Sequence, residues 1–151
     1  MKNKAKVIYK NYVEVNDNKY FVDGRKVVLN SSKIEIALAS WLSTVLNVRV
    51  EILPKINLPK GIQTSDYLID NERWDLKRIT SSRNNAIHTC IRNKKGQSSN
   101  FIFDISMSRL SVNSAKKQIC GLSSDFFWFK KAIIKKNKEY IVVDRKIICN
   151  L

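Results

Sequence analysis

The sequence predicts an α/β fold in which helices flank a mixed β-sheet. Three observations point to this class: helical periodicity over residues 32–46, short runs of β-formers over 7–29, and a nearly continuous apolar run over 101–105. A helix, a strand, a hairpin, a second helix and another strand follow one another, and this order places helices around a sheet. The chain of 151 residues is long enough for one domain with a substantial core.

We expect one domain, 1–151, built from three parts. Residues 1–30 form a β-rich N-terminal extension with a β-hairpin, residues of about 31–106 form the core, and residues 107–151 add a C-terminal helix and hairpin. Glycine and proline are scarce, with four and two residues, so we expect no long flexible linker between these parts.

The charge of the chain indicates a polyanionic partner. Lys and Arg number 28 against 13 Asp and Glu, which gives a net charge of +15. Such a surplus attracts nucleic acid first and a membrane surface second, while a merely lysine-rich surface is the alternative. No run approaches the roughly 18 apolar residues of a membrane span. Met1 is followed by no apolar signal segment, so we expect a cytoplasmic site of action.

Cysteine and histidine usage excludes several kinds of site. Cys90, Cys120 and Cys149 are odd in number and widely spaced, so they predict reduced thiols rather than a disulfide framework or a zinc site. A single histidine, His88, makes a His-based zinc site or a Ser-His-Asp triad improbable and is itself expected on a helix surface or in packing.

The N-terminal residues predict a small antiparallel sheet ahead of the main fold. Residues 7–9 and 12–15 are rich in β-formers. Residues 19–22 and 26–29 flank an Asp-Gly pair at 23–24, which is a strong hairpin signal.

Residues 32–46 form the clearest predicted helix. Ser32 and Glu35 make an S-x-x-E capping box, and Asn47 can end the helix. A strand over 48–53 and a loop to residue 64 should follow. The apolar residues at helical spacing are Ile34, Ala37, Leu38, Trp41, Leu42 and Val45.

An acidic hairpin over 65–77 is the most informative stretch. Side chains alternate along a strand, so Asp75 and Lys77 share one face. A two-residue turn at Asn71-Glu72 would place Asp66 opposite Lys77 on that face, with Leu68 opposite Asp75. Asp70 and Glu72 are then turn residues.

The second predicted helix runs from Ser81 or Ser82 to about Lys95, and Gly96 could end it. Its apolar side is formed by Ala86, Ile87, Cys90 and Ile91. Basic residues on and just before the helix are the best candidates for phosphate contacts, namely Arg78, Arg83, Arg92, Lys94 and Lys95.

The remaining elements complete the sheet. The apolar strand 101–105 suits a central or parallel position covered on both faces, and Asp104 within it needs a polar partner. A helix over about 113–120 and an aromatic core segment at 126–129 follow. Residues 140–143 and 146–148 predict a last hairpin about Asp144-Arg145.

The hairpin has the chemistry of phosphodiester hydrolysis. Two carboxylates can hold Mg²⁺ or Mn²⁺, which prefer oxygen ligands, and the metal activates a water. A neighbouring lysine can orient or deprotonate that water, or offset charge on the phosphate. The alternative is an ordinary charged face with a weak surface ion pair.

At this point the chain resembles a known family. Residues 64–69 and Trp74-Asp75-Leu76-Lys77 resemble the PD-(D/E)xK motif of restriction-endonuclease-like nucleases, and more closely the C-terminal nuclease domain of contact-dependent inhibition toxins. Residues 20–29, Val50-Glu51-Ile52-Leu53-Pro54 and 97–105 extend the similarity, although Ser65 replaces the motif proline. The resemblance implies a restriction-endonuclease-like mixed sheet, a divalent metal and cleavage of tRNA or DNA.

Carried onto this sequence, the resemblance assigns a role to each of five residues. Asp66 and Asp75 would be metal ligands, and Lys77 would be the motif lysine. Glu35 would match a glutamate from the first helix, and Gln97 a glutamine that follows the second helix. The capping box gives Glu35 a structural role as well, and Gln97 could equally be a loop residue, so both roles stay open.

Two hypotheses follow for the function. The first is a metal-dependent, toxin-like nuclease, with tRNA favoured over DNA, that is delivered as part of a larger toxin and is met by a cognate immunity protein. The alternative is a non-catalytic or DNA-directed nucleic-acid-binding domain of a phage or mobile element. A third reading, a partner-binding module that uses the N-terminal sheet, has less support.

Overall fold

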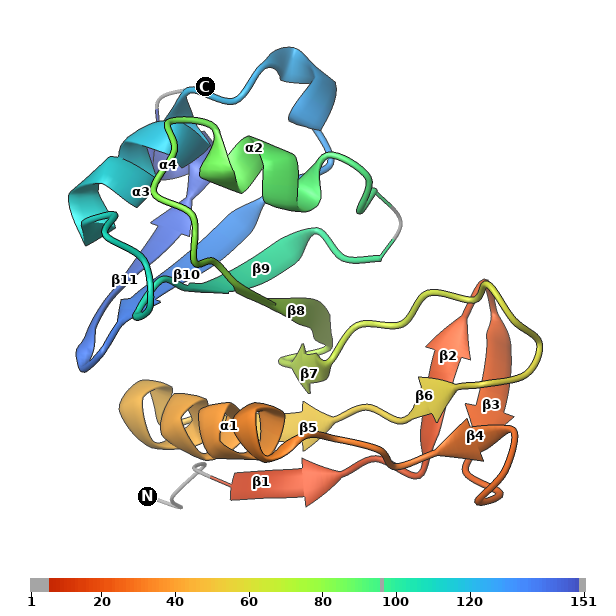
Figure 1. The fold of residues 1–151 in the computed structure, drawn as a ribbon. Coiled ribbons are helices and arrows are strands. Elements are labelled where there is room, and N and C mark those ends of the chain that lie inside the picture. The colour runs from red at the N-terminus through yellow and green to blue at the C-terminus, as the bar shows by residue number, and fades with distance from the viewer. Residues whose placement is uncertain (1–5, 96, 150–151) are drawn as a thin grey trace. The chain divides into compact units, whose positions relative to one another are not determined.

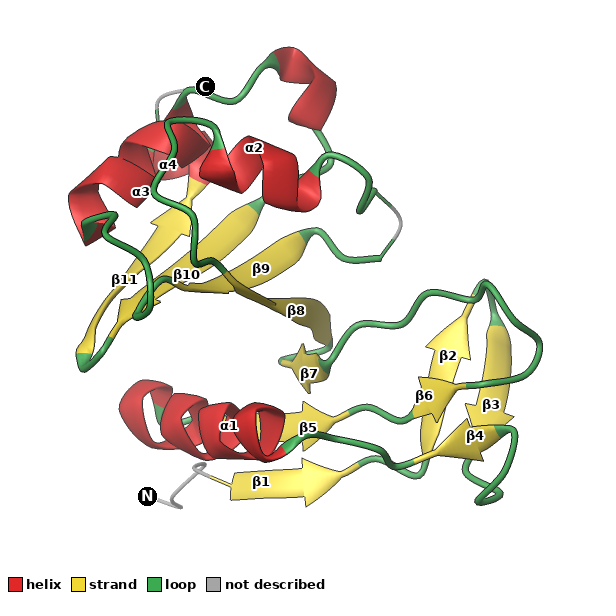
Figure 2. Cartoon of the chain, in the orientation of Figure 1, coloured by secondary structure: helices red, strands yellow, loops and turns green. Residues whose placement is uncertain are grey.

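The computed structural model describes residues 6–95 and 97–149. The chain divides into two compact units, Met1–Trp74 and Asp75–Leu151. Each unit contains a mixed sheet with helices packed on it, as the predicted α/β class requires (Figures 1 and 2). In the described part of the chain, no helix has the length and apolar character that crossing a membrane requires.

The first unit has a sheet with strand order β1, β5, β7, β8. β1 and β5 are parallel, whereas β7 is antiparallel to both β5 and β8. Helix α1, Lys33–Leu46, packs against β5 and β1. The four strands are β1 (Lys6–Tyr9), β5 (Arg49–Ile52), β7 (Tyr67–Ile69) and β8 (Glu72–Arg78), of which β8 ends in the second unit.

Helix α1 begins and ends as predicted. Ser32 Oγ accepts a hydrogen bond from the Glu35 N–H, Glu35 Oε1 accepts one from the Ser32 N–H, and Asn47 takes a left-handed conformation at the C-terminus. The predicted apolar face is partly wrong, because Ile34 is 44% exposed. The buried face keeps Leu38 and Leu42 from the predicted set but adds Ala39 and Ser43, so it is rotated about the helix axis from the predicted one.

The N-terminal strands pair differently from the prediction. β2 (Tyr12–Val15) and β3 (Asn18–Phe21) form an antiparallel hairpin within the predicted β-rich extension. β4 (Val27–Val28) pairs with β6 (Lys55–Ile56) rather than with residues 19–22, so the predicted Asp-Gly hairpin is wrong. The reason is local, because Asp23 Oδ1 accepts hydrogen bonds from three backbone N–H groups of residues 25–27 and closes a loop there.

The sheet of the second unit contains the apolar strand identified in the sequence. β9 (Asn100–Asp104) is parallel to β10 (Lys131–Lys136), and four of its five residues are buried, as predicted for a covered parallel strand. β11 (Glu139–Asp144) is antiparallel to β10. Helices α2 (Ala86–Ile91), α3 (Val112–Cys120) and α4 (Arg145–Ile148) belong to the same unit, in which α3 packs on β10 and β11, α4 contacts β11, and α2 packs against α3 (Figure 1). The 3₁₀ turn η1 (Ser124–Phe126) follows α3 along the chain.

Two predicted elements of this unit need correction. The last hairpin turns at residues 137–138, where Asn137 has a φ of 55°, and not at Asp144-Arg145. Asp144 instead caps α4, since its Oδ1 accepts a hydrogen bond from the Lys146 N–H. Helix α2 is shorter than the predicted 81–95, because Ser81 Oγ accepts from the Arg83 N–H and fixes a turn ahead of it. The predicted stop at Gly96 lies outside the described residues.

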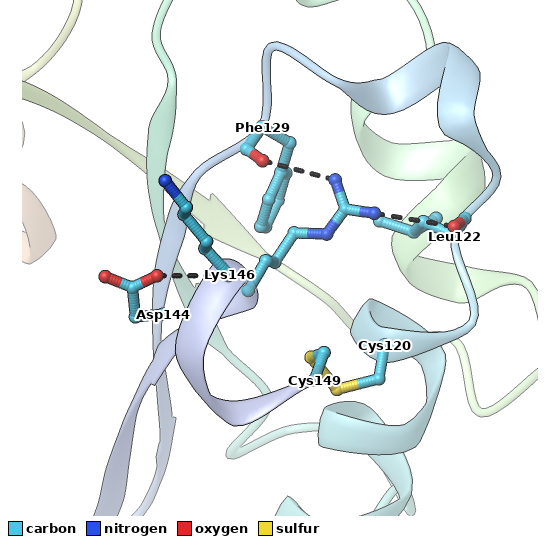
Figure 3. The surroundings of a disulfide bond; sticks show 7 residues. Cys120, Leu122, Phe129, Asp144, Lys146 and Cys149 are labelled. Atoms are coloured by element: carbon cyan, nitrogen blue, oxygen red, sulfur yellow. Dashed lines mark hydrogen bonds between the residues drawn. A yellow bond between two sulfur atoms is a disulfide. The ribbon is translucent and has the colours of Figure 1, made fainter. Parts of the chain in front are cut away.

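Aromatic packing and a disulfide hold the second unit together. Phe101 and Phe103 stack on Phe129, with ring centroids 5.4 and 6.0 Å away. Cys120 and Cys149 form a disulfide with their Cα atoms 5.2 Å apart, so the prediction of three reduced thiols is wrong (Figure 3). The predicted final strand is in fact α4, and this helix brings Cys149 to α3.

A buried arginine lies beside this disulfide. Arg145 is 5% exposed, and its guanidinium donates hydrogen bonds to the carbonyls of Phe126, Phe129 and Leu122. The accepting carbonyls of Phe129 and Leu122 are labelled in Figure 3. Burial lowers the pKa of Arg145. The aromatic segment is core as predicted for Phe126 and Phe129, whereas Phe127 is 72% exposed.

Candidate active site

The acidic hairpin forms, but its register differs from the prediction by two residues. Asp70 and Asn71 have φ angles of 51° and 63° and make the two-residue turn. Tyr67 therefore lies opposite Trp74, and Glu72 is the first residue of β8. Asp and Asn tolerate the left-handed conformation far better than Glu does, which explains the shift. A shift of two residues leaves the facing of every side chain unchanged.

One group of predicted site residues meets in the first unit. We call Glu35, Lys55 and Asp66 the Glu35 cluster. Lys55 Nζ lies 2.5 Å from Asp66 Oδ1 and 3.4 Å from Glu35 Oε2. Tyr67 on β7 donates a hydrogen bond of 2.7 Å from its hydroxyl to the Glu35 carbonyl, which ties the first turn of α1 to the hairpin. The two carboxylates thus converge on a single cation.

The electrostatics of this cluster are set by Lys55. Burial alone would lower the pKa of the Lys55 ammonium, but the charges of Asp66 and then Glu35 outweigh burial and raise it. The ammonium therefore stays protonated and neutralises part of the acidic pair. The two carboxylate oxygens of Glu35 have different neighbours, because Oε1 accepts the hydrogen bond of the helix cap while Oε2 faces Lys55.

A second group meets in the second unit, and we call it the Lys77 cluster: Asp75, Lys77 and Gln97. Asp75 and Lys77 lie two residues apart on β8 and share a face, as the alternation predicted. Asp75 is 2% exposed, and its Oδ2 lies 2.6 Å from Lys77 Nζ. Lys77 Nζ donates a hydrogen bond of 3.3 Å to Gln97 Oε1. The lysine is held between a buried carboxylate and an amide.

Two residues near these clusters were not among the predicted site residues. Lys55 falls in a stretch predicted as loop, one residue beyond the similar segment that ends at Pro54, so nothing in the motif marked it. Cys90 on α2 lies close enough to the Lys77 cluster to feel its charges. Burial raises the pKa of the Cys90 thiol, against the opposing effect of Lys77. Cys90 is a free thiol and half-buried.

Other singled-out residues have ordinary structural surroundings. His88 is exposed on α2, with its ring edge-on to Phe126 at 5.0 Å. Asp104 Oδ1 accepts a hydrogen bond from the Ser106 N–H, which supplies the polar partner it needs. The predicted phosphate-contact residues are all in the second unit and are exposed, apart from half-buried Lys94: Arg78, Arg83, Arg92, Lys94 and Lys95.

The donors of the two clusters suit a hard cation in their chemistry. Glu35, Asp66 and Asp75 offer carboxylate oxygens, which Mg²⁺ and Mn²⁺ prefer. In the Glu35 cluster two carboxylates already converge on the Lys55 ammonium, so the same oxygens can face a cation. Within residues 6–95 and 97–149, no group of three or more His, Cys, Asp and Glu side chains is gathered closely enough to hold a metal by itself.

Comparison with known proteins identifies the family. A chain of the "CdiA-CT/CdiI toxin and immunity complex from Burkholderia pseudomallei" has a similar fold, with a TM-score of 0.58 and 19% sequence identity. The similarity covers 92% of this chain and 98% of that one. No curated protein matches the chain. Residues 63–146, more than half of the chain, match the family described as the contact-dependent growth inhibition CdiA C-terminal domain. The chain therefore belongs to the CdiA C-terminal toxin domain family.

Proposed function

We propose that this toxin domain is a metal-dependent nuclease of the PD-(D/E)xK type that hydrolyses phosphodiester bonds, with tRNA as its preferred substrate. The observation that carries the proposal is the Lys77 cluster. Three residues that the motif and the resemblance single out, Asp75, Lys77 and Gln97, lie within contact distance inside one unit. An ordinary ion pair on the surface lies between exposed side chains and contributes little to stability. Lys77 instead contacts a buried carboxylate and an amide, and this arrangement fixes its position.

Each residue of the Lys77 cluster has a definable task in the proposed reaction. Asp75 and Gln97 fix the position of the Lys77 ammonium, because both bind its Nζ. Lys77 can then orient the attacking water or offset the charge that builds on the phosphate. Asp75 also presents a carboxylate as a ligand for the cation. A bound Mg²⁺ or Mn²⁺ would supply Lewis acidity toward the phosphate and lower the pKa of a water.

Asp66 and Glu35 are the further ligands in this proposal. The capping box does not occupy the whole Glu35 carboxylate, since Oε1 accepts the capping hydrogen bond and Oε2 lies 3.4 Å from Lys55 Nζ. Lys55 neutralises part of the charge of the two carboxylates. Glu35 and Asp66 would hold a divalent ion through the same carboxylate oxygens, and the ion would supply positive charge there.

A non-catalytic or DNA-directed nucleic-acid-binding domain is the second candidate. Its specific support is that lysines already neutralise both clusters, with Lys55 on Glu35 and Asp66 and Lys77 on Asp75. Such a domain would bind nucleic acid in EDTA as well as in Mg²⁺. Removing the Asp75 charge would then strengthen binding rather than abolish an activity.

Substrate and metal are tested in one assay. Total tRNA and plasmid DNA are each incubated with the protein in Mg²⁺, Mn²⁺ or EDTA. The proposal predicts cleavage of tRNA that requires a divalent ion and exceeds the cleavage of plasmid DNA. Binding without cleavage of either substrate would support the second candidate and refute the nuclease.

We also propose a biological setting for this activity. The similar structure contains a toxin and an immunity protein, and by analogy this domain would be neutralised by a cognate immunity protein. The activity would be exerted in the cytoplasm of a target cell after delivery as the C-terminal part of a larger toxin. A pull-down with a candidate immunity protein, followed by the cleavage assay in its presence, tests this pairing.

A further inference from the structure

A cavity of about 800 Å³ in the second unit is lined by both polar and apolar residues. Its lining comes from the loop before α2, from α2 itself, and from α3 with the residues on either side of that helix. No residue of the Lys77 cluster lines it. The polar side chains on which the argument depends are Asn84, Asn85, His88, Arg109, Ser114 and Lys117.

The charged side chains that line this cavity are all positive. Arg109 and Lys117 line it, and no Asp or Glu does. Within the described residues neither of these two cations has an ion-pair partner, unlike Lys55 and Lys77. Cations that share a cavity without an acid repel one another, so an anionic ligand would relieve the repulsion.

The walls of the cavity are held in place by hydrogen bonds. Gln118 on α3 donates through Nε2 to the Arg83 carbonyl at 2.9 Å and accepts through Oε1 from the Ile87 N–H at 3.0 Å. These two bonds fix the loop that carries Asn84 and Asn85 against α3. Ser108 Oγ donates to the Ser81 carbonyl at 2.7 Å and ties the segment before α3 to the same loop. The cavity is therefore preformed.

Apolar groups form part of the same lining. Leu110 is 7% exposed, and Leu122 and Gly121 lie beside it. A site for a bare inorganic anion has no use for such a surface, whereas a ribose or base attached to a phosphate can pack on it. The combination of unpaired cations, amides and an apolar wall matches a nucleoside phosphate better than a simple anion.

We propose that this cavity binds a phosphate of a nucleic-acid backbone together with its attached nucleoside. Arg109 and Lys117 neutralise the phosphate, Asn84, Asn85 and Ser114 donate hydrogen bonds, and Leu110 packs against the sugar or base. The inference extends the proposed nuclease function by adding a substrate-holding site that is separate from the Lys77 cluster. The shared chemistry is a phosphate ester, whether it belongs to a polymer or to a free nucleotide.

The sole histidine of the chain is a built-in reporter, because His88 lines the cavity and gives one imidazole signal. We would follow that signal by NMR at constant pH and ionic strength while adding inorganic phosphate, AMP, or a short 2′-O-methyl RNA. A saturable shift with AMP or with the RNA is expected, and AMP shows whether a single nucleotide suffices. No shift with any phosphate ester, or the same shift with inorganic phosphate as with AMP, would overturn the proposal.

Binding of tRNA by charge-matched variants gives an independent test. Binding is measured in EDTA, and the integrity of the tRNA is checked on a gel. The variant Arg109→Gln/Lys117→Gln should bind tRNA roughly tenfold more weakly. The slope of its log affinity against log salt concentration should fall by about two, one for each cation removed. The control Lys130→Gln/Lys138→Gln removes the same charge from exposed positions outside the cavity. Equal losses in the two variants would contradict the site. The result does not depend on cleavage, so failure of the nuclease proposal remains distinguishable from failure of this one.

Discussion

The two compact units differ in charge and in how each treats its acids. Met1–Trp74 carries twelve Lys and Arg against eight Asp and Glu, a net charge of +4, whereas Asp75–Leu151 carries sixteen against five, a net charge of +11. In the first unit one lysine serves two carboxylates, and in the second one carboxylate and one amide position a lysine. The first unit therefore gathers two carboxylates around one lysine, while the second carries the larger positive charge.

This difference suggests a division of labour between the units. The acids of a nuclease have to bind a metal, and its lysines and arginines have to bind the substrate. Under the proposed function, the Glu35 cluster would contribute to the first need, and the Lys77 cluster with its basic surroundings would contribute to the second, with Asp75 as a further metal ligand. Four predictions test whether the division is real.

The largest effect should come from the two cluster lysines. Lys77→Met should lower tRNA cleavage by about 10²–10³-fold, because a preorganised charge at the phosphate is lost. Lys55→Met should lower it by less than about tenfold, because Lys55 only keeps the acidic pair together. Cleavage rates at saturating Mg²⁺ measure both, and Lys138→Met is the control. Equal losses of cleavage rate for the two variants would contradict the proposal that the two lysines have different tasks.

The stability of the second unit, and not that of the first, should depend on the disulfide. The Cys120–Cys149 bond closes a loop of 29 residues, for which chain entropy predicts a stabilisation of about 3–4 kcal/mol. Cys120→Ser/Cys149→Ser should lower the free energy of unfolding of this unit by that amount, as measured by urea denaturation. Cys90→Ser is the matched control, since Cys90 is a free thiol. If reductant leaves the unfolding of the native chain unchanged, the bond does not form in solution.

The first unit should lose stability at high pH through Lys55. Burial lowers the pKa of Lys55, but Asp66 and Glu35 raise it more, so the folded value lies above the unfolded one. The resulting stability is fully present below an ordinary lysine pKa of about 10.4 and is lost as the pH rises through the folded value. Between pH 9 and 11.5, the free energy of unfolding should fall more steeply for the native chain than for Lys55→Met. Parallel curves would show that the ion pairs contribute nothing.

The smallest effect separates the two roles of Glu35. Ser32→Ala removes the helix cap and should lower stability by about 1 kcal/mol without changing cleavage by more than a few-fold. Glu35→Gln keeps an oxygen for the cap but removes the charge, so it should reduce Mg²⁺-dependent cleavage at nearly unchanged stability. Thermal unfolding and cleavage are measured on both variants. A Glu35→Gln protein with full activity would leave Glu35 as a cap alone.

Local sequence patterns predicted those features of the fold that depend on neighbouring residues, such as helix ends and the facing of strand side chains. The capping box and Asn47 set both ends of α1, the apolar run at 101–105 required a covered strand, and alternation alone placed Asp75 and Lys77 on one face. Gln97 was predicted as a site residue only from the family resemblance. No sequence pattern around Gln97 indicates that it contacts Lys77.

Contacts between residues far apart in the sequence were not predicted, because no local pattern encodes them. Lys55 reaches Glu35 and Asp66 because β6 pairs with β4, and no nearby signal encodes that pairing. The disulfide depends on a short helix, α4, which Asp144 caps at its N-terminus and which Cys149 directly follows. The hairpin register depended on whether Asp70 and Asn71 or Asn71 and Glu72 took the left-handed turn.

The central claim is that Asp75 belongs to a metal-dependent phosphodiesterase site. The most direct measurement compares tRNA cleavage by the native chain and by Asp75→Asn, each in Mg²⁺ and in EDTA, with circular dichroism to confirm folding. The account predicts cleavage for the native chain in Mg²⁺ alone, and none for folded Asp75→Asn in either condition. Undiminished cleavage by Asp75→Asn, or cleavage by the native chain in EDTA, would contradict it.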